Sequence, residues 1–229
     1  MDLPTIKDGA IFISDAHYPH HGDEFFKLLC DIDNQKLNPT QIFLMGDIFD
    51  LLFGYNKYIK TFSQDAIELL DKISKDIDVF YLEGNHDFCL KDIFKHIQIY
   101  PQELQPVHFI LGDKIVGLSH GDKYDTPITY KIYSKILRNR YTLKILQPFE
   151  KSIIDYRMDK LSAKDICHPF KGFKDKAYRI VESYSGVDLV IEGHFHQAKQ
   201  LHRYISLPSL ACQKQIAVVK NSSIVFEDI

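Results

Sequence analysis

The stretch LEGNHDF, residues 82–88, joins an apolar run to a turn and sets an amide, an imidazole and a carboxylate side by side. Gly84 and Asn85 suit a turn, because both residue types tolerate a positive φ. A turn alone does not require His86 and Asp87 to follow. The stretch therefore indicates either a turn or a binding site, and the rest of the chain has to distinguish the two.

Short apolar runs recur along the chain, and several are continuous, as in strands that are buried on both faces. They are AIFIS (10–14), QIFLM (41–45), DVFYL (78–82), PVHFIL (106–111), KIVGLS (114–119) and DLVIE (188–192). Helix-like segments at 23–37 and 61–76 separate the first three runs, which predicts βαβ units and a largely parallel sheet. The runs YISLPS, QIAVVK and SIVFE after residue 202 predict a second sheet or an antiparallel extension.

Polar side chains follow five of these runs. They are Asp15 and His17; Asp47 and Asp50; Asn85, His86 and Asp87; His120 and Asp122; and His194 and His196. We expect them to meet, because ligands bind at the edge where parallel strands end. Carboxylates, imidazoles and an amide, without thiolates, favour Mn²⁺, Fe or Zn²⁺. So many ligands suit two ions that share a carboxylate, an arrangement used for displacement at phosphorus.

The motifs D-x-H, G-D-x-x-D, G-N-H-D, H-G-D and G-H-x-H stand in this order between Asp15 and His196. In this order they resemble the calcineurin-like metallophosphoesterase superfamily. The resemblance implies an α/β fold, a four-layer α/β/β/α metallophosphoesterase sandwich, with a dinuclear metal site. It also implies that Asn85 is a ligand and not only a turn residue.

The resemblance further implies a role for each motif residue. Two divalent metal ions, with Mn²⁺ expected, would be held by seven ligands, with Asp47 shared between the ions. His86 would be a catalytic residue near the leaving group, and Asp87 would orient it. The ligands implied for one ion are Asp15, His17, Asp47 and His196, and those for the other are Asp47, Asn85, His120 and His194.

Within the superfamily the chain is most similar to the UDP-2,3-diacylglucosamine hydrolases of lipid A biosynthesis. The similarity lies in G-D-x-F at 46–49, G-N-x-D-F at 84–88, H-G-D with a nearby Tyr at 120–124, and a helical insert before the last motif. Those enzymes usually have Arg at the position of His86. The resemblance implies cleavage of a nucleotide-sugar lipid, UDP-2,3-diacylglucosamine, to UMP and 2,3-diacylglucosamine 1-phosphate.

Other activities remain open at this stage. A general metallophosphodiesterase or a nucleotide pyrophosphatase would use the same metal site without needing the insert. A phosphomonoester phosphatase and a non-catalytic binding module are further alternatives, although all seven implied ligands are present.

The expected insert, residues 123–187, interrupts a core formed by 1–122 and 188–229. Within 123–179 there are 14 Lys and Arg against 6 Asp and Glu, a net charge of +8, which leaves −11 for the rest of the chain. One interpretation is a helical hairpin that packs an apolar stripe onto the body and exposes a basic face. The other is a cap that binds an acyl chain and contacts anionic lipid headgroups.

The residues of the insert that carry these interpretations fall into two sets. The apolar stripe consists of Ile132, Tyr133, Ile136, Leu137, Tyr141 and Ile145. The expected substrate-binding residues are Asp122, Tyr124, Lys131, Lys135 and Arg138, the last three on one basic face.

Composition and charge restrict the partners and the compartment. The four cysteines, Cys30, Cys89, Cys167 and Cys212, are scattered, so we expect reduced thiols in a cytoplasmic protein. No signal peptide and no membrane span are expected, although peripheral association with the inner membrane is compatible with the insert. The net negative charge around the site disfavours nucleic acid, and no obligate protein partner is evident.

Overall fold

The first apolar runs and the C-terminal strands form one six-stranded sheet. The computed structural model describes residues 3–124 and 127–229, apart from the side chains of Tyr130, Lys131 and Tyr133. The strand order is β13-β12-β1-β2-β4-β6, in which β1, β2, β4 and β6 are parallel and β12 is antiparallel to β1. The bounds are β1 Ile11–Ile13, β2 Gln41–Leu44, β4 Asp78–Leu82, β6 Gln98–Tyr100, β12 Gln215–Lys220 and β13 Ser223–Asp228.

A second sheet has the order β10-β11-β9-β8-β7. Its strands β7 and β8 form a hairpin that turns through Gly112, which has a φ of 62°. A short parallel pair, β3 and β5, lies apart from both sheets. The bounds are β3 Leu52–Phe53, β5 Asp87–Phe88, β7 Val107–Leu111, β8 Lys114–Ser119, β9 Leu189–Glu192, β10 Lys199–Leu201 and β11 Tyr204–Ser206.

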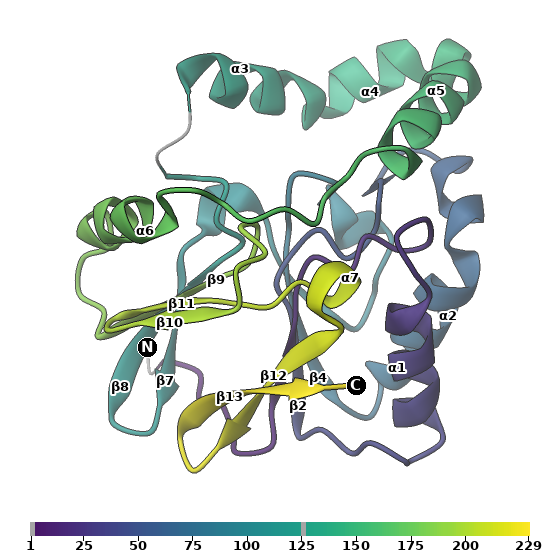
Figure 1. Cartoon of the computed structure of the whole chain (residues 1–229). Helices are drawn as coiled ribbons and strands as arrows, with labels where there is room; N and C mark the ends of the chain where they lie inside the picture. The colour runs from purple at the N-terminus through teal and green to yellow at the C-terminus, as the bar shows by residue number, and fades with distance from the viewer. Residues whose placement is uncertain (1–2, 125–126) are drawn as a thin grey trace.

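The two sheets pack face to face and helices cover their outer faces (Figure 1). Between the sheets, Phe43 stacks on Phe12 at 4.6 Å and on Phe80 at 4.8 Å between ring centroids. Helices α1 (Glu24–Asp33) and α2 (Gln64–Ile73) cover the first sheet, and α6 (Phe173–Glu182) packs Phe173 and Ile180 against the second. The predicted four-layer α/β/β/α sandwich is therefore confirmed.

The remaining helices lie above the carboxyl ends of the strands or connect them. Helices α3 (Ile128–Leu137), α4 (Arg140–Leu146) and α5 (Glu150–Ser162) form a layer over the sandwich (Figure 1). The α5 residues Ile154 and Met158 are buried in the core cluster of the first sheet. The short helices are η1 Ile59–Phe62, η2 Leu90–Asp92, η3 Gln102–Leu104, η4 Gln147–Phe149 and α7 Leu210–Gln213. None of the described helices is long and apolar enough to cross a membrane.

The expected packing of the apolar stripe is wrong for four of its members. Ile132, Ile136, Tyr141 and Ile145 are 53% to 75% exposed, whereas Leu137 lines a cavity. These four side chains face outward because α3 and α4 turn Leu137, Leu143 and Leu146 toward the sandwich. The side chain of Tyr133 lies outside the described residues.

The expected basic face is also wrong in part. The Arg138 side chain is only 8% exposed, with its guanidinium 3.5 Å from Glu83 and donating to the Gly84 carbonyl at 2.5 Å. It lies at the end of α3, where the helix comes closest to the loop after β4. Lys135 is exposed as expected, and the side chain of Lys131 lies outside the described residues.

The expectation of four reduced cysteines is wrong as well. Cys167 and Cys212 form a disulfide, whereas Cys30 and Cys89 are free. The paired residues are 45 positions apart in sequence, and the fold brings their Cα atoms to 5.3 Å. Spacing along the chain gives no signal for such a pair.

Candidate metal centre

The strand-end loops hold their polar residues in an unusual backbone conformation. Asp15, His17, Asp47, His194 and His196 all have φ between 47° and 62°. Left-handed φ is uncommon outside glycine, and such residues cluster at functional sites. The five conformations point to a site that the surrounding structure holds in place.

The first group of possible ligands combines the loop after β1 with the loop after β9. One ligand atom from each of Asp15, His17 and His196 lies within 4.8 Å of the other two. Asp15 is fully buried, and its Oδ1 lies 3.1 Å from His196 Nε2 without accepting a hydrogen bond. A buried carboxylate oxygen without a donor is the observation expected where a cation belongs.

The second group consists of Asp47, His120 and His194, again within 4.8 Å. His120 donates from Nδ1 to the Met45 carbonyl at 2.8 Å, so its Nε2 faces the site. That Nε2 lies 3.5 Å from Asp47 Oδ2 and 3.3 Å from Asn85 Oδ1. Asn85 therefore stands beside this group, as the motif order predicts.

Burial and neighbouring charges set the protonation of these groups. Burial lowers the pKa of His17 and of His194 to about 4, so both imidazoles are neutral near pH 7, the form that binds metal ions. Burial opposes ionisation of Asp47, but the charges of His120 and His86 hold the pKa of its carboxyl well below the usual value. Burial opposes protonation of His120 and of His196, but the carboxylates raise the pKa of both, so these two imidazoles would give up a proton on binding a cation. With one ionised carboxylate and one neutral imidazole already present, each group fits a divalent cation.

Asp87 does not have the expected role. It is fully buried and accepts hydrogen bonds from the backbone N–H groups of Asp47, Ile48 and Gly84 and from the Tyr81 hydroxyl, at 2.6 to 3.0 Å. Successive residues in an extended chain point to opposite sides, so Asp87 turns inward where His86 turns outward. Asp87 therefore joins two ligand-bearing loops and does not orient His86.

Asp50 holds His86 instead. The Asp50 carbonyl accepts from His86 Nδ1 at 2.7 Å, which leaves Nε2 of this cavity-lining side chain available to a ligand. The Asp50 carboxylate lies 3.0 Å from His20 Nδ1 and 2.7 Å from His21 Nδ1. In the sequence, this cluster was indicated by Asp50 in G-D-x-x-D and by His20 and His21, which follow the D-x-H motif closely.

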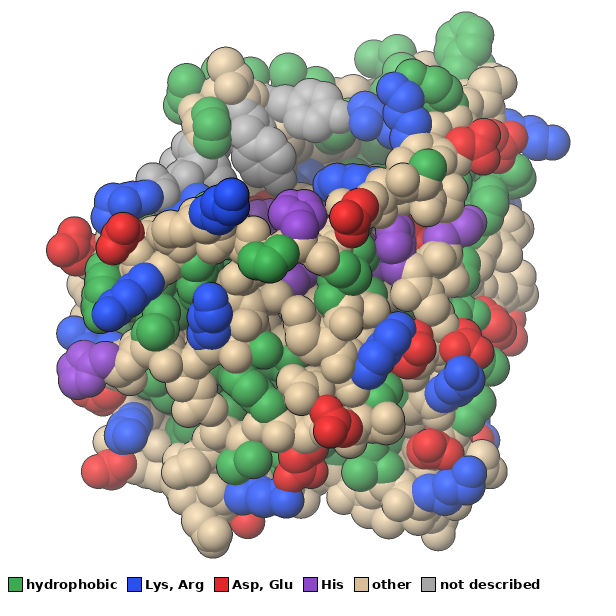
Figure 2. Space-filling model, viewed as in Figure 1, with side chains coloured by type: hydrophobic (Ala, Val, Ile, Leu, Met, Phe, Trp, Pro, Cys, Tyr) green, Lys and Arg blue, Asp and Glu red, His purple; other side chains and the backbone are tan. Residues whose placement is uncertain are grey.

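A cavity of about 470 Å³ opens beside Asn85 and His86. Most of its wall is apolar, and it lies between the sandwich and helices α3 to α5. Figure 2 shows histidine side chains along the hollow between this helical layer and the body. The lining residues are Leu51, Phe53, Asn56, Phe88, Ser134, Leu137, Arg138, Leu143, Leu146, Glu150, Ile153, Ile154, Arg157, Leu161 and Lys164 with Asn85 and His86.

Only one of the expected substrate-binding residues lines this cavity among the described side chains, and it is Arg138. Asp122 is buried and accepts from Gln102 Nε2 at 2.6 Å. The Tyr124 ring packs against Tyr184 at 5.2 Å between centroids. The exposed Lys135 lies on α3 outside the cavity wall.

The fold and the site define a class of protein, a phosphoesterase with a centre for divalent metal ions at the strand ends. The sequence model of the calcineurin-like phosphoesterase family matches residues 10–198, and the chain belongs to that family.

Curated relatives share one name. The chain is 25% identical to the UDP-2,3-diacylglucosamine hydrolase of Hamiltonella defensa, over 90% of this chain and 84% of the relative. It is also 25% identical to the enzyme of the same name from Aliivibrio fischeri, over 86% and 84% of the two chains. The relative of that name from Psychromonas ingrahamii is 25% identical over 82% and 80%.

Proposed function

We propose that this protein hydrolyses UDP-2,3-diacylglucosamine to UMP and 2,3-diacylglucosamine 1-phosphate, as the names of its relatives suggest. The observation that carries the proposal is the apolar cavity beside Asn85 and His86. A general phosphodiesterase or nucleotide pyrophosphatase needs the metal centre but has no use for an apolar chamber next to it.

The cavity supports an acyl chain as part of the substrate. Its volume of about 470 Å³ lies in the range of small-molecule sites. Leu137, Leu143 and Leu146 come from the helical layer, and Phe53 and Phe88 come from the sandwich, so a chain between them would be enclosed from two sides. Each buried methylene contributes about 0.8 kcal/mol, so even part of one chain would contribute strongly to affinity.

We propose the seven motif residues as ligands of two divalent ions, with Mn²⁺ as the expected metal. The described geometry that supports this assignment is the pair of three-residue groups, with Asn85 beside the second. The ions, when bound, polarise phosphoryl oxygens and lower the pKa of a bound water. Asp47 is placed to serve both groups, because its carboxylate lies 3.5 Å from His120 Nε2 in the second and its backbone carbonyl accepts from the His17 N–H at 3.1 Å in the first.

The protein's own residues position the diphosphate and its acyl groups. His86 lines the cavity together with Asn85, and its Nε2, which Asp50 does not hold, can donate to a phosphoryl oxygen in the imidazolium form. Arg138 keeps the Gly84 turn in place from the cap side. We propose that the cap consists of α3 to α5 and the linker after them, because α6 packs on the second sheet.

Metal dependence and reaction are tested together by UMP release from UDP-2,3-diacylglucosamine. We expect the protein reconstituted with Mn²⁺ to bind two ions and release UMP. Asp47→Asn should bind fewer ions and lose at least about 10³-fold in kcat, because a charged ligand shared by both groups is lost. Asp33→Asn, at a half-buried carboxylate on α1 outside both groups, is the matched control and should keep both ions and full activity. One bound ion with full activity in Asp47→Asn would contradict the shared ligand.

We propose a peripheral membrane role for the outer face of the cap. Ile132 and Ile136 on α3 are more than half exposed, Lys135 lies between them, and Figure 2 shows apolar side chains along this upper rim. Inserting two half-exposed Ile side chains contributes about 2 kcal/mol, so Ile132→Ser/Ile136→Ser should bind anionic vesicles more than about tenfold more weakly in sedimentation. Leu104→Ser/Val225→Ser, exposed on the body, should bind like the wild type. Equal binding of all three proteins would remove the membrane role.

A further inference from the structure

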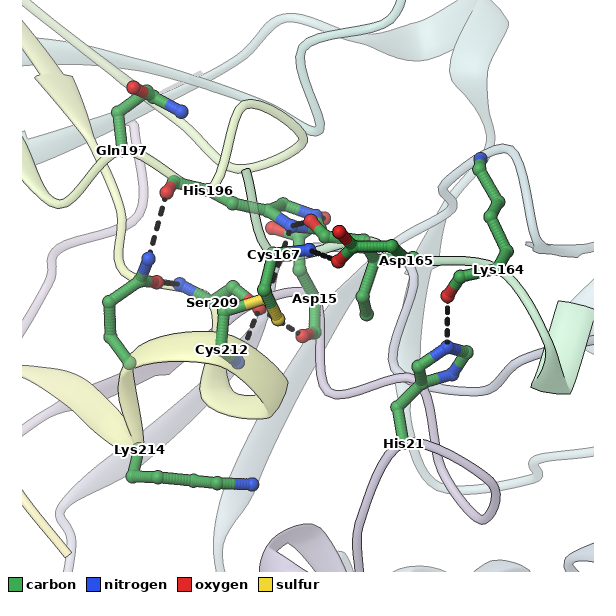
Figure 3. Close-up of a disulfide and its surroundings, with 12 residues drawn as sticks. Asp15, His21, Lys164, Asp165, Cys167, His196, Gln197, Ser209, Cys212 and Lys214 are labelled. Carbon is green, nitrogen blue, oxygen red and sulfur yellow. Dashed lines mark hydrogen bonds and ion pairs between the residues drawn. A yellow bond between two sulfur atoms is a disulfide. The ribbon is translucent and has the colours of Figure 1, made fainter. Parts of the chain in front are cut away.

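The disulfide lies beside a proposed metal ligand. Cys167 belongs to the linker between α5 and α6, and Cys212 belongs to α7 on the sandwich. Cys212 Sγ lies 3.7 Å from Nδ1 of His196, and Figure 3 shows the bridge beside His196 and Asp15. The bond therefore joins the end of the cap to the loop region of the first ligand group.

The linker contacts the site through its backbone at three points. The Ile166 carbonyl accepts from His196 Nδ1 at 3.1 Å, and the Lys164 carbonyl lies 3.1 Å from His21 Nε2. The Phe170 N–H donates to Gln197 Oε1 at 3.3 Å. Cys167 thus bonds covalently to the body in the middle of a segment that contacts the loop of His21 and the loop of His196.

Besides these backbone contacts, the Phe170 ring at the end of the linker packs against Phe173 and Phe195, at 6.1 Å between centroids. Between residues 163 and 170 every side chain except the half-buried Ile166 is exposed. Apolar burial therefore contributes little to its docking. The disulfide restricts the conformations open to the linker, and so limits how far the linker can move away from His196.

The contact with Ile166 determines which nitrogen of His196 can bind a metal ion. A carbonyl only accepts, so His196 Nδ1 carries the proton and Nε2, which faces Asp15 at 3.1 Å, presents its lone pair. Partners of this kind fix the orientation and tautomer of a ligand, and their loss typically costs about 10- to 100-fold in metal affinity.

We propose that the Cys167–Cys212 disulfide is a reducible clamp that keeps the Ile166 carbonyl on His196 and so tunes metal binding by Asp15, His17 and His196. A dithiol reductant supplies two electrons and two protons, the S–S bond breaks, two thiols form, and the dithiol closes to a disulfide. The exposed Cys167 gives the reductant access. The inference rests on the proposed assignment of His196 as a ligand.

The test compares metal affinities of oxidised and reduced protein. Free Mn²⁺ is measured by electron paramagnetic resonance for oxidised wild type, wild type reduced with dithiothreitol and desalted anaerobically, and Cys167→Ser. A non-reducing digest verifies the linked peptide. We expect one of the two sites to weaken by about tenfold in the reduced protein and in Cys167→Ser, with the other unchanged. Cys30→Ser/Cys89→Ser, which keeps the bridge, should match wild type in both states.

The clamp would be overturned if the affinity of each site were the same in all proteins, or if a digest of the oxidised protein lacked the linked peptide. Equal weakening of both sites would also overturn it, because a general loss of structure would act on both groups. If the protein binds two ions normally but releases no UMP from the lipid substrate, only the proposed function is contradicted. The comparison of metal affinities would still show whether the disulfide tunes metal binding.

Discussion

UDP-2,3-diacylglucosamine should be hydrolysed with a kcat/KM more than about 10³-fold above that of UDP-glucosamine, because burial of about six methylenes contributes about 5 kcal/mol. The two substrates share the diphosphate and the uridine, so the ratio of their kcat/KM values measures the contribution of acyl-chain binding in the apolar cavity. UMP release is measured for both in Mn²⁺ and detergent, which separates substrate preference from binding to membranes.

Two variants on helix α4 test whether the cavity is responsible for the preference for the acylated substrate. Leu146 lines the cavity, whereas its neighbour Ile145 is 75% exposed. Leu146→Trp should fill part of the chamber and lower kcat/KM for the acylated substrate by about tenfold or more, as overpacking of about 1–3 kcal/mol implies. Ile145→Trp should leave it unchanged, and both variants should act on UDP-glucosamine like the wild type. Equal rates on the two substrates would end the lipid proposal and favour the general phosphodiesterase.

His86→Ala should lower kcat by about 10²- to 10⁴-fold, as expected for the loss of a proton donor or of a group that stabilises developing charge. The Asp50 carbonyl holds Nδ1 of His86, and His86 belongs to neither ligand group. Metal content should therefore remain at the wild-type value. The measurement is single-turnover UMP release with elemental analysis of the same samples.

His108→Ala is the matched control for this variant. His108 lies half-buried on β7 in the second sheet, away from both ligand groups, and its loss should leave kcat unchanged. If His86→Ala loses an ion, His86 is itself a ligand and its proposed catalytic role is wrong. Unchanged turnover with a full complement of metal would show that the reaction does not need the imidazole.

The sequence by itself predicted a largely parallel sheet with polar residues at its strand ends, and the resemblance of its motifs to the phosphoesterase family implied the four-layer sandwich and the ligand set. Continuous apolar runs gave the strands, and Asp15, Asp47 and Asn85 follow parallel strands of one sheet, so their side chains had to meet at one edge. This inference needs only the order of the motifs and the direction of the strands, both of which are local properties of the chain.

Only the tertiary structure decided which side chain serves which neighbour. His86 is held by Asp50, 36 residues earlier, and not by the adjacent Asp87, whose carboxylate accepts from the backbone N–H of Gly84 instead. Arg138 reaches Gly84 across 54 residues, and Cys167 bonds Cys212 across 45. Such contacts depend on how separate segments pack, so the spacing of residues along the chain carries no signal for them.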